Sequence, residues 1–186
     1  EAAVTWAAVS LADKADTLVG LFAAGERPTG TRDPFGLRRQ AHGLLRVLVD
    51  LPELTGLNRD VDLAAVCAEA RRGLEDLAEP GLAPGPEPPA ERSALFAFLG
   101  ERLRFLFQQR GYAYDEINAV AGSSRGFMDR PHDARLRLDA LHQVRSSVDF
   151  EALAVAFKRV KNLARELGRG PVDGLSRLTE PAERAL

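Results

Sequence analysis

Apolar residues recur along the chain at the three- and four-residue spacing of amphipathic helices. In residues 2–24 they fall on one face, while polar side chains occupy the other face. Similar patterns predict further helices over residues 33–49, 62–77, 91–110, 115–121, 133–148 and 150–167. Alanine, leucine, arginine and glutamate are frequent and β-branched runs are few, which favours helices. The sequence therefore predicts an all-α fold with almost no sheet.

Capping and turn residues indicate where several of these helices begin. Asp33 is placed to act as an N-cap, with Pro34 at the first helical position. Residues 52–58 contain proline, glycine and asparagine and are predicted to form a loop. Asp60 or Asp62 then caps the next helix.

A proline-rich stretch divides the chain. Residues 79–90 contain five prolines and two glycines, which do not sustain a helical hydrogen-bond ladder and are typical of a linker. We therefore predict one helical unit over residues 1–78 and a second over residues 91–186. Short connections between the helices of the second unit predict a small antiparallel bundle.

Charge distinguishes the two halves. The whole chain has a net charge of −2, which argues against a generally basic nucleic-acid binder. Residues 1–90 carry nine Lys or Arg against fourteen Asp or Glu, a net −5, whereas residues 91–186 carry sixteen against thirteen, a net +3. A surface that faces phosphates is therefore expected in the second half.

Cysteine usage and hydropathy exclude several classes of protein. The single cysteine, Cys67, is interpreted as a small core residue, because one thiol forms neither an internal disulfide nor a zinc site of thiolate pairs. No apolar run approaches the ~20 residues of a membrane span, and the first residues do not begin a signal peptide, so we expect a cytoplasmic protein without a membrane partner. The chain starts in a helical pattern without methionine, which indicates a piece of a longer protein.

Candidate catalytic groups are few. Asp13 and Asp16 share a helix face and would suit a metal or a basic partner, although a solvated or lysine-paired acidic face is the commoner explanation. The histidines His42, His132 and His142 lie on separate elements without metal-ligand spacing or a triad arrangement. We therefore predict no catalytic set and no cofactor in this chain.

Arg102 is an unusual cation because it falls within the apolar stripe of the helix predicted over residues 91–110. A buried guanidinium is costly unless it is paired. We expect a structural partner, with Asp115 the first candidate, and keep a carbonyl cluster or a ligand phosphate as alternatives.

The helix predicted over residues 150–167 combines an apolar face with basic flanks. Its predicted core face comprises Leu153, Ala156, Phe157, Val160, Ala164 and Leu167. One exposed flank comprises Lys158, Lys161 and Arg165, and the other comprises Arg159, Asn162 and Glu166. This basic stripe is suited to tracking a phosphate backbone, and a merely solvated face is the alternative.

The turn over residues 28–33 precedes a helix start and is followed by Arg38 and Arg39. Such a turn can present backbone N–H groups to a phosphate. It is not a P-loop, because the Gly-Lys-Ser/Thr ending is absent. A tight interdomain turn with a capping aspartate explains the same residues.

Several short sequence motifs, in a fixed order along the chain, resemble those of a known family. LADKADTLVG over residues 11–20, PTG over residues 28–30 and DPFGLRR over residues 33–39 resemble the β subunit of the bacterial heterotetrameric glycine–tRNA ligase. Downstream segments, among them KRV over residues 158–160, resemble its anticodon-binding domain. DALH over residues 139–142 resembles the Asp-Ala-Leu-Arg signature of the helical anticodon-binding bundle of arginine–tRNA ligases, with His142 in place of the final arginine.

The resemblance implies a domain arrangement. Residues 1 to about 50 resemble the end of an HD-type helical domain, followed by a helical-bundle anticodon-binding domain. In metal-dependent HD proteins an aspartate placed like Asp13 completes a site whose other ligands lie upstream, outside this chain. Asp13 is therefore expected to make local contacts only.

The resemblance also implies a function. ATP-dependent aminoacylation is expected in the α subunit of an α2β2 heterotetramer, while the β subunit binds tRNA(Gly), so this fragment is predicted to be non-catalytic. The candidate tRNA contacts are Arg38, Arg39, Arg102, Tyr112, Arg135, Arg137, Lys158, Arg159, Lys161, Asn162 and Arg165. Arg38 and Arg39 have an alternative role as interdomain pins.

Two further expectations accompany these contacts. Tyr112, Tyr114 and Phe127 are candidates for stacking on an unpaired anticodon base. The alternative functions are a structural module for subunit assembly and a remnant of an HD-type metal phosphohydrolase.

Overall fold

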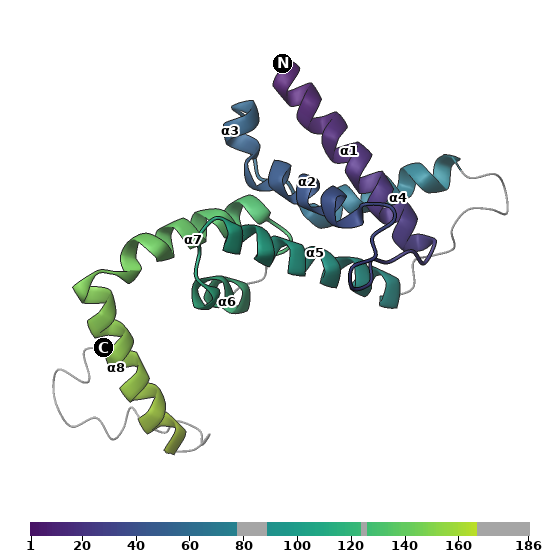
Figure 1. Ribbon diagram of the computed structural model, residues 1–186. Helices are drawn as coiled ribbons and strands as arrows, with labels where there is room; N and C mark the ends of the chain where they lie inside the picture. The colour runs from purple at the N-terminus through teal and green to yellow at the C-terminus, as the bar shows by residue number, and fades with distance from the viewer. Residues whose placement is uncertain (78–88, 124–125, 167–186) are drawn as a thin grey trace, which may run out of the picture. The chain divides into compact units, whose positions relative to one another are not determined.

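The computed structural model describes residues 1–77, 89–123 and 126–166 (Figure 1). Within these residues the chain is helical, and one isolated bridge between Thr29 and Arg32 is the sole pairing of extended backbone. The helices are α1 Ala2–Ala23, α2 Leu37–Val49, α3 Leu51–Thr55, α4 Leu63–Leu77, α5 Pro89–Gln109, α6 Tyr114–Ser123, α7 Pro131–Arg145 and α8 Val148–Glu166. The predicted all-α class is confirmed.

The hydrophobic core lies between α1, α2, α4 and α5. The apolar face of α1 packs against α2 and α4, and α2 also packs against α5. Large side chains that are fully buried in this core include Leu18, Leu44, Leu45, Leu63, Leu99, Leu103 and Phe107. Burial of each such side chain contributes about 1.5–3 kcal/mol of hydrophobic free energy, so this core is the main source of stability.

The helices before and after the proline-rich stretch share this core. The chain divides into compact units at another position, with Glu1–His142 as the first unit and Gln143–Leu186 as the second. The boundary predicted at residues 79–90 therefore does not coincide with the division between compact units. Most of that stretch lies outside the described residues, and α5 begins within its last two residues.

The start of α2 differs from the prediction. Gly36 occupies the N-cap position that was predicted for Asp33, but the Asp33 carboxylate still accepts hydrogen bonds from the backbone N–H groups of Leu37 at 2.8 Å and Arg38 at 3.0 Å. The helix begins at Leu37, three residues after Pro34, because residues 33–36 form a turn of their own closed by Gly36 N–H on the Asp33 carbonyl at 3.1 Å. Gly36 ends that turn at φ +65°, a conformation that favours glycine.

The segment predicted as a loop over residues 52–58 contains the short helix α3. Pro52 lies in its first turn, where a proline costs no helical hydrogen bond, and Gly56 ends it at φ +73°. The next helix follows the prediction more closely. The Asp62 carboxylate accepts a hydrogen bond from Ala65 N–H at 2.9 Å and so caps α4.

The predicted core face of α8 is exposed. The periodicity correctly predicted the helix, yet Leu153 is 65%, Phe157 66% and Val160 62% exposed. Burial of an apolar face requires a facing element, and α8 is the only described helix that lies wholly within the second unit. The last residue of the predicted face, Leu167, lies outside the described residues.

Among the described residues, every helix is too short or too polar to cross a bilayer.

We predict that Asp33→Ala lowers the free energy of unfolding by about 1 kcal/mol, because two N–H groups at the start of α2 lose their acceptor. Urea denaturation followed by circular dichroism measures this loss. Asp16→Ala is the matched control, since Asp16 is an exposed carboxylate inside α1 where alanine is well tolerated. Equal stabilities of the Asp33→Ala variant and the wild type would contradict the capping role.

Candidate nucleic-acid interface

A network of ion pairs joins the end of α2 to the end of α5 and to α7. Asp50, between α2 and α3, accepts two hydrogen bonds from Arg110, from Nη1 at 2.7 Å and from Nη2 at 2.6 Å. Arg135 on α7 donates to the same carboxylate at 3.0 Å and to Glu53 on α3. A bidentate guanidinium–carboxylate pair fixes direction as well as distance. The network therefore sets how these helix ends meet.

Two other contacts reinforce the same junction. The side chain of His132 is buried on α7, and its Nδ1 atom lies 2.9 Å from the carbonyl oxygen of Val49, the last residue of α2. The N–H group of Leu63, at the start of α4, donates to the Asp129 carbonyl at 2.9 Å. Residues before α5 and residues after it are thus joined through backbone atoms as well as side chains.

The network keeps its charges ionised. Burial alone would raise the pKa of Asp50, but the hydrogen bonds and charges of Arg110 and then Arg135 outweigh it and lower that pKa. The hydrogen bond from Arg135 lowers the pKa of Glu53 against the opposing effect of burial. Burial also acts to lower the pKa of Arg135, and its contacts with Glu53 and Asp50 raise it instead. The contacts between Asp50, Glu53 and Arg135 therefore favour the charged form of each group.

The network changes what can be expected of two candidate contacts. The Arg135 side chain is 16% exposed and is shared between two carboxylates, with a third, Asp139, 3.9 Å from its Nε atom. Arg137 is 42% exposed and pairs with Asp133 at 2.6 Å. A phosphate would have to compete with these carboxylates for either cation, so neither is a free positive charge.

Tyr112 belongs to a second polar cluster. Its hydroxyl donates to the carboxylate of Asp139, and its ring meets the ring of His142 edge-on at 6.0 Å. Burial, together with the nearby Asp139 carboxylate, raises the pKa of Tyr112 to about 12. His142, which stands where the resembling signature has arginine, lies 3.1 Å from the buried carboxylate of Glu116 through Nδ1. The DALH segment therefore holds α6 and Tyr112 in place.

The candidate stacking residues differ in exposure. Phe127 is 6% exposed and packs against Phe107, so the expectation that it stacks on a base is wrong for this structure. Tyr114 is 70% exposed at the start of α6. Of the three aromatic candidates, Tyr114 alone presents an open ring.

Arg102 lies against aromatic rings on its own helix. Its guanidinium carbon is 5.9 Å from the centroid of the Phe98 ring and 5.6 Å from that of Phe105. The Nε atom is buried and has no hydrogen-bond partner among the described residues. The sequence predicted a structural partner, with Asp115 as the first candidate and a carbonyl cluster or a ligand phosphate as alternatives, and the structure shows these cation–π partners.

The α8 basic face, defined as Lys158, Lys161 and Arg165, is exposed. Among the described residues no carboxylate pairs with these three cations, and the contact of Arg165 is to the amide oxygen of Asn162 at 2.9 Å. Arg159 is also exposed, on the other flank. The basic residues on both predicted flanks are thus open to solvent, and described carboxylates form no ion pair with them.

The turn before α2 places the last two candidates. Arg38 donates a hydrogen bond from Nη2 to the Gly30 carbonyl at 2.8 Å, so its guanidinium holds the turn to the helix. Arg39 is exposed, one position farther along α2. The backbone N–H groups proposed for a phosphate at the start of α2 already bind the Asp33 carboxylate.

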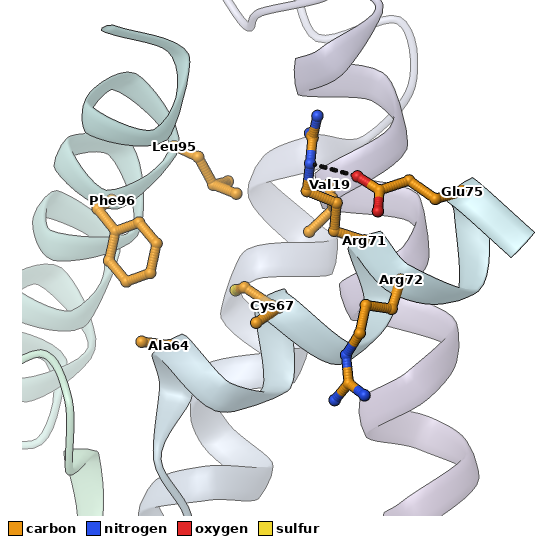
Figure 2. Close-up of a pocket in the computed structure, with 9 residues that line it drawn as sticks. Val19, Ala64, Cys67, Arg71, Arg72, Glu75, Leu95 and Phe96 are labelled. Carbon is orange, nitrogen blue, oxygen red and sulfur yellow. Dashed lines mark ion pairs between the residues drawn. The ribbon is translucent and has the colours of Figure 1, made fainter. Parts of the chain in front are cut away.

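A cavity of about 180 Å³ lies beside Cys67, between α1, α4 and α5 (Figure 2). Leu95 and Phe96 of α5 line it opposite Cys67, as Figure 2 shows, and Arg71 pairs with Glu75 beside it at 3.0 Å. Cys67 is buried, in agreement with its interpretation as a core residue. The lining is mainly apolar and offers no acid–base pair aimed at a common point.

The sequence analysis did not predict the ion pairs of Asp50 with Arg110 and Arg135. Asp50 and Arg110 are 60 residues apart, and Asp50 and Arg135 are 85 residues apart. No local pattern signals such pairs, because capping and helical periodicity concern neighbours within a few residues. Glu116 was missed as well, although the acidic first turn of α6 offered a local signal.

Comparison with known proteins gives consistent matches. The family model described as glycyl-tRNA synthetase beta subunit matches residues 2–122. The glycine–tRNA ligase beta subunit of Aromatoleum aromaticum is 40% identical over 98% of this chain and 24% of its own length. Those of Acidobacterium capsulatum and Ralstonia nicotianae are 37% and 36% identical over 96% and 98% of the chain. The chain spans about a quarter of the length of these relatives.

We predict that Asp50→Asn lowers the free energy of unfolding by about 1–3 kcal/mol at neutral pH, because Arg110 and Arg135 lose a charged acceptor in a partly buried site. Urea denaturation measures the loss. Asp60→Asn is the control: its pair with the exposed Arg130 spans 3.9 Å, so a change within about 0.5 kcal/mol is expected. Equal losses in the two variants would remove the special role of Asp50.

The stabilising effect of Asp50 is expected to depend on pH. Because its pKa is lower in the folded protein than the ordinary 3.8, its contribution is present above that value and is lost as the pH falls through the folded pKa. The difference in unfolding free energy between wild type and Asp50→Asn should be constant above about pH 5 and shrink below about pH 4. Urea titrations from neutral to acidic pH test this. A difference that grows on acidification would sink the assignment.

Proposed function

Because the chain belongs to the family of glycyl-tRNA synthetase β subunits, we propose that it is the tRNA-binding, anticodon-recognising portion of such a subunit. In this proposal it supports ATP-dependent glycylation of tRNA(Gly) in the cytoplasm, and the α subunit of an α2β2 heterotetramer carries the reaction. The fragment itself contributes binding and no catalytic group or cofactor. The end of an HD-type domain and a helical anticodon-binding bundle are the proposed domains.

The observation that carries the proposal is the α8 basic face. Binding to a nucleic-acid backbone draws on cations that release counterions when they meet phosphates, which requires charges that are not already neutralised. Lys158, Lys161 and Arg165 meet this requirement among the described residues. Arg159 and Asn162 extend the contact along the other flank. Arg135 and Arg137 are secondary, since carboxylates hold them.

Base recognition is assigned to an open aromatic ring. Tyr114 is exposed, so we assign base stacking to its ring. The Tyr112 hydroxyl is bound to Asp139, so we assign Tyr112 a positioning role. Stacking of single-stranded bases on aromatic rings is a common mode of RNA recognition. Arg102 supports the Phe98 and Phe105 rings.

A second candidate function is a structural module for subunit assembly. The apolar face of α8, with Leu153, Phe157 and Val160 exposed, supports it, because such a face on one helix is typical of a protein contact. This face runs beside the basic face, so the two functions need not exclude each other. In contrast, no observation favours a phosphohydrolase remnant: Asp13 contacts its neighbour Lys14 at 3.6 Å, and the described residues contain no group of three potential metal ligands.

We predict that replacing Lys158, Lys161 and Arg165 together by alanine weakens binding of tRNA(Gly) and flattens its salt dependence. Three lost phosphate contacts reduce the slope of log affinity against log salt by about 2 to 3. Filter-binding titrations at several salt concentrations, with tRNA(Gly) and a non-cognate tRNA, measure both quantities.

A control variant removes Arg46, Arg59 and Arg72, three exposed cations of the first unit of which Arg72 pairs with Glu69, and should leave the slope nearly unchanged. Equal effects of the two triple variants would show that net charge alone matters. Unchanged tRNA binding by the folded α8 triple variant would remove the α8 basic face from the proposal.

A Leu153→Ser/Phe157→Ser variant tests the second candidate function. Loss of α-subunit binding with tRNA binding retained favours a role in subunit assembly.

A further inference from the structure

The segment before and into α2 is a rigid surface loop. We call residues 27–39 the arginine turn. Thr29 and Arg32 exchange two backbone hydrogen bonds of 3.0 and 2.7 Å, and the Asp33 carboxylate binds the start of α2. Arg38 fixes the tip by donating to the Gly30 carbonyl. Three independent contacts thus determine the shape of a loop whose residues are mostly exposed.

Gly30 and Gly36 allow the loop to fold back so sharply. Their φ angles are +47° and +65°, in the left-handed region where a side chain is strained. An added Cβ at Gly36 would lie 3.4 Å from an Arg39 nitrogen, so the Arg39 guanidinium packs close to this turn. Arg39 is therefore held beside the loop although it belongs to α2.

The exposed surface of the arginine turn is cationic. Arg27, Arg32 and Arg39 are exposed, and among the described residues no carboxylate forms an ion pair with any of them. The acid closest in sequence to the tip, Asp33, directs its carboxylate to backbone N–H groups of α2. Three guanidinium groups thus remain available to an external anion.

The same turn also carries an exposed aromatic residue. Phe35 is 49% exposed, on the turn that links Asp33 to Gly36. Phe35 is not part of the hydrophobic core, and the exposed half of its side chain costs solvation free energy. Arginines next to an open aromatic ring match single-stranded nucleic acid, whose phosphates take the cations and whose bases stack on the ring.

We propose that the arginine turn is a second RNA-binding surface, in which Arg27, Arg32 and Arg39 bind backbone phosphates and Phe35 stacks on an unpaired base. The proposal rests on the proposed tRNA-binding function and adds a contact far from α8 in the sequence. Phosphate binding by the N–H groups at the start of α2 is excluded, because Asp33 occupies them. Arg38 is a positioning residue that holds the tip.

Two variants separate the phosphate contacts from the stacking contact. Arg32→Ala/Arg39→Ala should weaken tRNA(Gly) binding and reduce the salt slope by about 1.4 to 1.8, as expected for two lost phosphate contacts. Phe35→Ala should weaken binding at least about fivefold and leave the slope unchanged, because stacking involves no counterion release. Both changes lie at exposed side chains, and circular dichroism verifies that each variant folds.

Controls distinguish failure of this inference from failure of the proposed function. Arg46→Ala/Arg59→Ala removes two exposed cations elsewhere in the same unit that also lack an ion pair with a described carboxylate, and should have little effect on the slope. Wild-type chain that does not bind tRNA overturns both proposals. Wild-type binding that is weakened by the α8 triple variant and unaffected by the turn variants overturns this inference alone.

A final comparison addresses an acidic protein as the ligand. Polyglutamate is titrated against the wild type, Arg32→Ala/Arg39→Ala and Phe35→Ala. RNA binding that depends on Phe35, with polyglutamate binding that does not, supports the inference. If Phe35→Ala changes neither, the turn recognises negative charge alone and the RNA assignment is overturned.

Discussion

The pairing of Asp50 with Arg110 and Arg135 is the contact on which the rest of the first unit depends. Hydrophobic burial between α1, α2, α4 and α5 supplies most of the stability but has little directional preference. The bidentate pair with Arg110 adds direction at the place where the end of α2 meets the end of α5. It also explains why a proline-rich stretch in the sequence does not separate two compact units.

The same network sorts the cations of the chain by function. Guanidinium groups enclosed among carboxylates, such as that of Arg135, stabilise the fold. Separating them from their partners would leave partly buried charges unpaired. Exposed cations without an ion pair to a described carboxylate lie on α8 and on the arginine turn, and also include Arg46 and Arg59. Net charge hides this difference: a chain with a total charge of −2 still presents two local surfaces suited to phosphates.

Local signals predicted much of this structure, and distant contacts escaped them. A capping role for Asp33, a cap at Asp60 or Asp62 and the periodicity of α8 were predicted, because each depends on neighbours within a few residues. Asp62 is the cap of α4, whereas Gly36 takes the N-cap position of α2 and Pro34 lies outside that helix. Pairing of Asp50 with residues 60 and 85 positions away follows from packing, which no local pattern encodes. The burial expected for α8 failed for the same reason, since periodicity shows that a helix has an apolar face and not what covers it.

If the two proposed surfaces bind the same RNA, they have an energetic consequence that either one alone lacks. Each surface offers three cations, too few for tight binding at physiological salt if each acts separately. Once one of them holds an RNA, the other meets the same molecule at an effective concentration set by the connecting chain, and no new contact is needed for a gain of several powers of ten. If both surfaces bind as proposed, the loss of either contact therefore lowers the affinity by that same factor.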